Sequence, residues 1–183
     1  MFGHTDEIMP LTTLLNGDLA SGSGHNSDKT IKIWNPEDGT LKKTLPGHTN
    51  YIWVLKTLSH GYLASASYLE IKIWNQEDGS LKKTLSCHNS HVLSLTTLSN
   101  GDLVSSSYQE IKIWNPEDGT LKRTLTGLSY EVGILATLLN GDLASGSSDG
   151  VIKVWNTNGI VIGWVSARYG YPAYFNMFQH VLT

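Results

Sequence analysis

The sequence of 183 residues has little cysteine, no long apolar run and no strong excess of one charge. Its single cysteine, Cys87, excludes an internal disulfide framework and a zinc site made of several cysteines. The apolar stretch at 159–167 is far shorter than the roughly 20 residues of a membrane span. Residues 1–10 contain acids and no apolar core of a signal peptide. Thirteen basic against sixteen acidic residues give a net charge of −3, so no global positive field favours nucleic acid or anionic lipid. We therefore expect an intracellular, cytoplasmic protein that binds neither membrane nor nucleic acid.

The sequence does contain a repeat of about 40 residues. The string IKIWN occurs at 31–35, 71–75 and 111–115, and IKVWN follows at 152–156. A fixed period of this length is typical of stacked or radial repeat proteins. We divide the chain into four repeats, at about 3–46, 47–86, 87–126 and 127–165.

Each repeat predicts four short strands, which are clearest in repeat 2. The strands expected there cover 52–58, 62–67, 71–75 and 81–85. His60-Gly61 joins the first two, and the other repeats have Asn-Gly, which favours a two-residue turn with positive φ at both positions. In the third strand, isoleucines occupy one face while lysine and tryptophan occupy the other. Apolar groups on both faces indicate an all-β protein whose sheets are covered on both sides.

These repeats resemble the WD-repeat β-propeller family. The resemblance rests on Gly-His before the first strand, LASGS in the second and IKIWN at the end of the third, with Trp-Asn where the family usually has Trp-Asp. It covers residues 3–165 and implies one four-stranded antiparallel blade per repeat. Four blades cover little more than half of the ring usual in the family, so we expect an open arc or partial ring. The alternatives are two chains that close one ring and four blades that close by altered packing.

The resemblance also implies a buried hydrogen-bond chain of His, Ser or Thr, Asp and Trp in each blade. Carried over to this sequence, its members are His4, Ser21, Asp28 and Trp34; His48, Ser65 and Trp74; His88, Ser105 and Trp114; and Ser145, Asp149 and Trp155. Repeats 2 and 3 have Leu69-Glu70 and Gln109-Glu110 in place of an aligned Asp, and repeat 4 has Leu128 in place of the His. We therefore expect a complete chain in repeat 1 alone and softer or rearranged blades elsewhere.

Serine, histidine and aspartate also form catalytic triads, but here they recur with the repeat. A triad occurs once and needs an exposed nucleophile beside an oxyanion pocket. The sequence shows no metal-ligand cluster and no phosphate-binding loop. We expect no enzymatic activity, no metal and no cofactor.

The repeats differ most in the segments that enter the first strand. These segments are HTDEIM, HTNYIW, HNSHVL and LSYEVG, at 4–9, 48–53, 88–93 and 128–133. In the family this loop and the turn before IKIWN, which contains Tyr68 or Tyr108 in repeats 2 and 3, form the face that most often binds peptides, and a constant frame with divergent loops is typical of an interaction surface. Packing between blades is the competing interpretation of the tryptophan in this set, and a solvated loop that of the tyrosines. The candidate partner-binding residues are Asp6, Glu7, Tyr51, Trp53, Tyr68, His91, Tyr108, Tyr130 and Glu131.

The sequence thus predicts a non-enzymatic scaffold that binds peptides or domains of other proteins. The alternative is a truncated fragment or half-propeller whose partner is another propeller segment, including a second copy in a homodimer. Residues 166–183 leave the repeat. Apolar residues there at helical spacing after Pro172 favour a short capping helix on the fourth blade, and degenerate sequence is the alternative.

Overall fold

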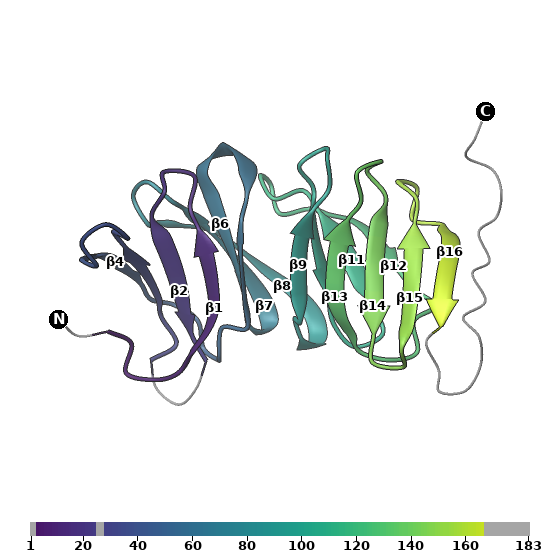
Figure 1. Ribbon diagram of the computed structural model, residues 1–183, viewed down its shortest axis with the longest axis horizontal. Coiled ribbons are helices and arrows are strands. Elements are labelled where there is room, and N and C mark those ends of the chain that lie inside the picture. The colour runs from purple at the N-terminus through teal and green to yellow at the C-terminus, as the bar shows by residue number, and fades with distance from the viewer. Residues whose placement is uncertain (1–2, 25–27, 167–183) are drawn as a thin grey trace.

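The computed structural model describes residues 3–24 and 28–166. These residues form four antiparallel sheets of four strands each, and in every sheet the strands pair in chain order. The sheets follow one another along the long axis of the molecule, so the described part of the chain forms an open arc (Figure 1). The predicted all-β fold of four four-stranded blades is confirmed. The predicted capping helix lies outside the described residues.

The strand boundaries are as follows. Blade 1 contains β1 (Ile8–Thr13), β2 (Leu19–Ser23), β3 (Ile31–Trp34) and β4 (Leu41–Leu45). Blade 2 contains β5 (Val54–Thr57), β6 (Tyr62–Ala66), β7 (Tyr68–Asn75) and β8 (Leu81–His91), with the short 3-10 helix η1 (Ser59–Gly61). Blade 3 contains β9 (Ser94–Thr97), β10 (Leu103–Ser106), β11 (Ile111–Trp114) and β12 (Leu121–Leu125). Blade 4 contains β13 (Val132–Thr137), β14 (Leu143–Ser147), β15 (Val151–Trp155) and β16 (Val161–Ser166).

Each blade has two different apolar faces, because side chains alternate between the faces of a strand. In blade 2 one face, here called the isoleucine face, carries Ile71 and Ile73, and the opposite tryptophan face carries Leu63 and Trp74. Three hydrophobic clusters of described residues lie between successive blades. In each cluster the isoleucine face of one blade packs against the tryptophan face of the next. Burial between blades therefore holds the array together.

The turn between the first two strands differs from the predicted two-residue turn. At the three Asn-Gly sites only the glycine has a positive φ, for example 87° at Gly17. The Gly17 N–H donates to Leu14 O at 3.0 Å, so the loop has three residues. The Asn16 side chain bonds both the backbone and the carboxylate of Asp18, at 3.0 Å in each case. The asparagine therefore stabilises the turn through these side-chain hydrogen bonds, and its own backbone does not adopt a positive φ.

Blade 2 also departs from the predicted strand boundaries. Its third strand begins at Tyr68 and its fourth continues to His91, so both are longer than expected. Tyr68 pairs with His91, and the ladder is interrupted at Leu69, which has a φ of 65°. The turn before β7 is four residues shorter than in repeat 1, and the two strands extend past it. The segment that enters blade 3 is thereby held against blade 2.

Candidate functional site

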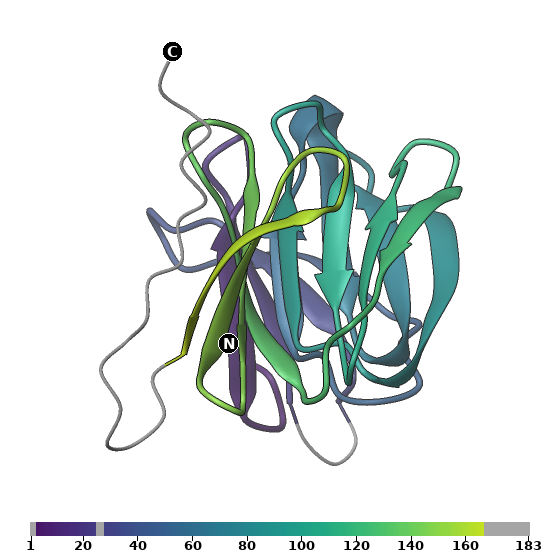
Figure 2. The same cartoon turned by 90° about the vertical axis from the view of Figure 1, so that its right-hand side faces the viewer.

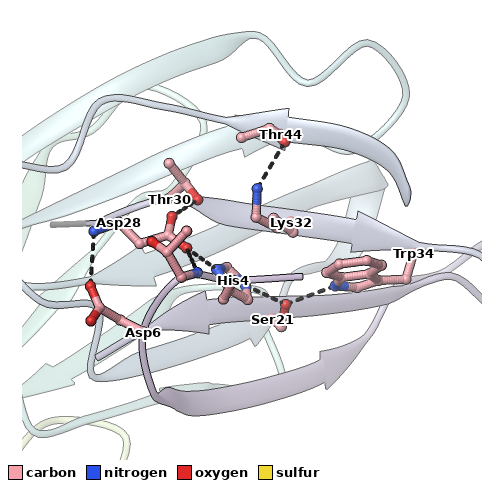
Figure 3. Close-up of polar contacts among 9 residues, drawn as sticks. His4, Asp6, Ser21, Asp28, Thr30, Lys32, Trp34 and Thr44 are labelled. Atoms are coloured by element: carbon pink, nitrogen blue, oxygen red, sulfur yellow. Dashed lines mark hydrogen bonds and ion pairs between the residues drawn. The ribbon is translucent and has the colours of Figure 1, made fainter. Parts of the chain in front are cut away.

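In blade 1 four polar side chains form a continuous hydrogen-bond chain (Figure 3). Trp34 Nε1 donates to Ser21 Oγ at 2.8 Å, and His4 Nε2 lies 2.7 Å from the same oxygen. His4 Nδ1 lies 2.8 Å from Asp28 Oδ2, and the Thr30 hydroxyl also bonds this carboxylate. Burial raises the pKa of Asp28, but the hydrogen bonds from Thr30, a backbone N–H and His4 together lower it below its usual value. The structure thus brings together the four predicted members in this blade.

Blades 2 and 3 have the same chain with glutamate in place of aspartate. His48 Nδ1 lies 2.9 Å from Glu70 Oε1, its Nε2 lies 2.6 Å from Ser65 Oγ, and Trp74 Nε1 donates to Ser65 at 2.8 Å. The expectation that repeat 1 alone has a complete chain is therefore wrong. The preceding turn is four residues shorter than in repeat 1 and one shorter than in repeat 4, and the extra methylene of glutamate spans the remaining distance to the imidazole.

Blade 3 repeats this geometry closely. His88 Nδ1 lies 2.7 Å from Glu110 Oε1, and its Nε2 lies 2.8 Å from Ser105 Oγ. Trp114 Nε1 donates to Ser105 at 2.9 Å. A glutamate directly before IKIWN in both repeats is the sequence signal that identifies these two acidic residues.

The proton positions in these chains follow from burial. Burial lowers the pKa of His48 and of His88 below the usual 6.5, although the neighbouring glutamates act in the opposite direction. A neutral imidazole donates from Nδ1–H to the carboxylate and accepts the serine hydroxyl proton at Nε2. The serine oxygen then accepts the indole N–H. Burial raises the pKa of Glu70, but hydrogen bonds from His48 and from Lys72, at 3.1 Å, lower it overall.

Blade 4 retains only part of the chain. Trp155 Nε1 donates to Ser145 Oγ at 2.9 Å, while a buried Leu128 occupies the position of the histidine. Asp149 accepts the Ser147 hydroxyl and the Val151 N–H, the latter at 3.1 Å. The expected place of Asp149 in a polar chain therefore needs correction. No imidazole is present in this blade's frame to bind it, and the carboxylate closes the local turn instead.

Four of the candidate partner-binding residues form one aromatic cluster, namely Tyr51, Trp53, Tyr68 and His91. The rings of Trp53 and His91 are edge to face with centroids 5.6 Å apart. The ring centroids of Tyr68 and His91 are 4.8 Å apart, and those of Tyr51 and Trp53 are 6.3 Å apart. The cluster combines the loop before β5, the first residue of β7 and the last residue of β8. It forms because the extended β8 carries His91 back onto blade 2.

Buried polar atoms without a hydrogen-bond partner accompany this cluster. Among the described residues they are Trp53 Nε1, His91 Nδ1, Ser67 Oγ and the hydroxyl of Ser23. Ser67 directly precedes Tyr68, and its carbonyl accepts the N–H of Val92 at 3.3 Å. An unpaired buried polar group costs about 1–3 kcal/mol, so three at one place are unusual in a repeated frame. Ser67 is not among the candidate residues predicted from the sequence.

The remaining candidates lie in two further groups. Tyr108 forms a β-bridge with Glu131, and the Gln109 N–H donates to Tyr130 O at 3.2 Å, where the entry to blade 4 meets blade 3. At blade 1, Asp6 and Glu7 enter β1. There the Asp28 N–H donates to Asp6 Oδ2 at 3.2 Å, and the Gly24 N–H donates to Glu7 O at 2.7 Å. The structure therefore separates the candidates into three groups along the array.

Within residues 3–24 and 28–166, no three His, Cys, Asp or Glu side chains lie together as potential metal ligands. In the same part of the chain, none of the helical structure has the length and apolarity that would span a bilayer.

The fold and these polar chains define an array of propeller blades. Comparison with protein families gives a match to the WD40 family, described as "WD domain, G-beta repeat", over residues 79–115 and 118–156. Each match runs from the fourth strand of one blade to the third strand of the next. These matches identify WD40 repeats at residues 79–115 and 118–156, and the four sheets of the same construction are consistent with a partial WD-repeat propeller. A comparison with curated proteins gave no match. WD40 repeats generally form domains that mediate protein–protein interactions.

Proposed function

We propose that this protein is a non-enzymatic interaction scaffold that binds peptide segments of other proteins through the aromatic cluster. The observation that carries the proposal is the cluster of four rings itself, in which Tyr68 is exposed. Tyrosine and tryptophan are favoured anchors of protein contacts because they bury a large area at little entropic cost.

The repeat supplies an internal comparison that supports this role. The position of Trp53 is occupied by Met9, Leu93 and Gly133 in the other repeats. The frame therefore does not require an indole at this position.

The serines of the hydrogen-bond chains support the proposal that the protein is not an enzyme. Ser21, Ser65, Ser105 and Ser145 are each buried, with at most 2% of their surface exposed. Each accepts the N–H of a tryptophan. A hydroxyl held in this way is not placed to attack a substrate.

Selection from a phage-displayed peptide library, followed by binding measurements, tests the proposal. Peptides selected on the unsubstituted chain should lose at least tenfold in affinity for Trp53→Leu, which keeps the apolar contact but removes the indole, and for Tyr68→Ala. Trp164→Ala provides the control, because Trp164 is exposed on β16, away from the cluster. Failure to select any peptide, or peptides that bind both cluster variants as well as the control, would refute the role of the cluster.

A further inference from the structure

The two ends of the array expose faces that are buried at every internal junction. At each junction a tryptophan face receives the isoleucine face of the preceding blade. Blade 1 has no described blade before it, and blade 4 has none after it. Figure 2 shows the array from the blade 4 end, with that blade's sheet in front of the others.

The tryptophan face of blade 1 is exposed. Leu11 in β1 has 58% of its surface exposed, whereas the residues at the same position in blades 2, 3 and 4 are only 6–9% exposed, namely Leu55, Leu95 and Leu135. Ile8 is also half exposed, whereas the residues at the same position in the other blades, Ile52, Val92 and Val132, are fully buried.

The isoleucine face of blade 4 is exposed in the same way. Ile152 in β15 is 47% exposed, and its counterparts Ile31, Ile71 and Ile111 are fully buried. Leu138 is also exposed, whereas Leu14 and Leu58 at the same position are buried. The register of β14 with β15 is the register of β2 with β3, so the pattern of side chains on this face is that of the internal junctions.

We infer that a second copy of this chain docks head to tail on these end faces, with blade 4 of each copy against blade 1 of the other. A second copy is the partner that fits these faces, because the three internal junctions of this chain each join an isoleucine face to a tryptophan face. The exposed faces are the two unmatched halves of that same contact. Two head-to-tail junctions in one dimer cover all four end faces, so the contact closes and does not propagate. The dimer has eight blades, which lies within the usual range of about four to eight for propellers.

Light scattering during size-exclusion chromatography of the full chain tests this inference. The unsubstituted chain should have twice the mass of one chain at micromolar concentration. Leu11→Glu and Ile152→Lys lie at opposite ends, and each should reduce the mass to that of a single chain, because each places a charge in both junctions. A mixture of these two variants should recover the dimer, since one junction then pairs two unchanged faces and the other pairs the new acid with the new base.

The controls address folding and the direction of docking. Leu81→Glu changes a leucine with 47% exposure on the outer strand of blade 2, so it should leave the dimer intact. Circular dichroism should be the same for all variants, and Leu11→Ala is the milder substitution, expected to weaken the dimer at least tenfold. A single-chain mass for the unsubstituted chain would overturn the inference and would indicate that residues 167–183 or another partner cover the ends. Species that grow with concentration, loss of the dimer in only one end variant, or its loss in Leu81→Glu would overturn it equally.

Discussion

Replacement of Ser65 by alanine tests how much the buried polar chain of a blade contributes to stability. The Ser65 hydroxyl is fully buried and bonds both Trp74 Nε1 and His48 Nε2, at 2.8 and 2.6 Å. The substitution leaves two buried groups unpaired, and each such group costs about 1–3 kcal/mol. We therefore expect Ser65→Ala to lower the free energy of unfolding by about 2–6 kcal/mol.

Blade 4 provides the matched control for this experiment. Ser145 bonds Trp155 Nε1, and the histidine is replaced by Leu128, so Ser145→Ala leaves only the indole N–H unpaired. Its expected cost is about 1–3 kcal/mol, half that of Ser65→Ala, while Ser105→Ala in blade 3 should match Ser65→Ala. Urea unfolding followed by circular dichroism, at one protein concentration, measures all three. Equal losses for Ser65→Ala and Ser145→Ala would refute the view that the serine–histidine bond stabilises the blade.

Two further predictions concern acid and backbone strain. Because burial lowers the pKa of His48 and His88, the unfolded chain binds more protons than the folded chain below pH 6.5, so stability should decrease as the pH falls from there. Urea midpoints measured across this range should decline less steeply in His48→Leu, and an unchanged slope would contradict the assignment. Gly39 has a φ of 71° and free space around its Cα, so Gly39→Ala should cost about 1 kcal/mol through the left-handed backbone alone, and a neutral melting temperature would contradict this.

The sequence was sufficient to predict the number of blades, their four strands and their two apolar faces. This is because a period near 40 and the alternation within IKIWN reflect the backbone geometry directly. The acidic members of blades 2 and 3 were missed, because alignment on aspartate compares positions along the chain. Whether Glu70 reaches His48 depends on the length of the turn and of the side chain together.

The aromatic cluster could be predicted only in part. Three of its residues were identified from the divergence of the entering loops and Tyr68 from the shortened turn before the third strand, but their assembly depends on the extension of β8 to His91. Nothing in the sequence of that segment separates a longer strand from a loop. The unpaired hydroxyl of Ser67 likewise follows from packing alone.

The presence of both complementary faces on every blade also affects how the protein can change over time. Gain or loss of one whole unit, as through unequal exchange between its similar coding segments, would join the same two faces as before. Insertion of a single residue within a strand would instead turn the following side chains to the wrong side of the sheet. The chain can therefore change length in steps of one blade far more easily than in smaller steps. No single blade determines how many blades the chain contains.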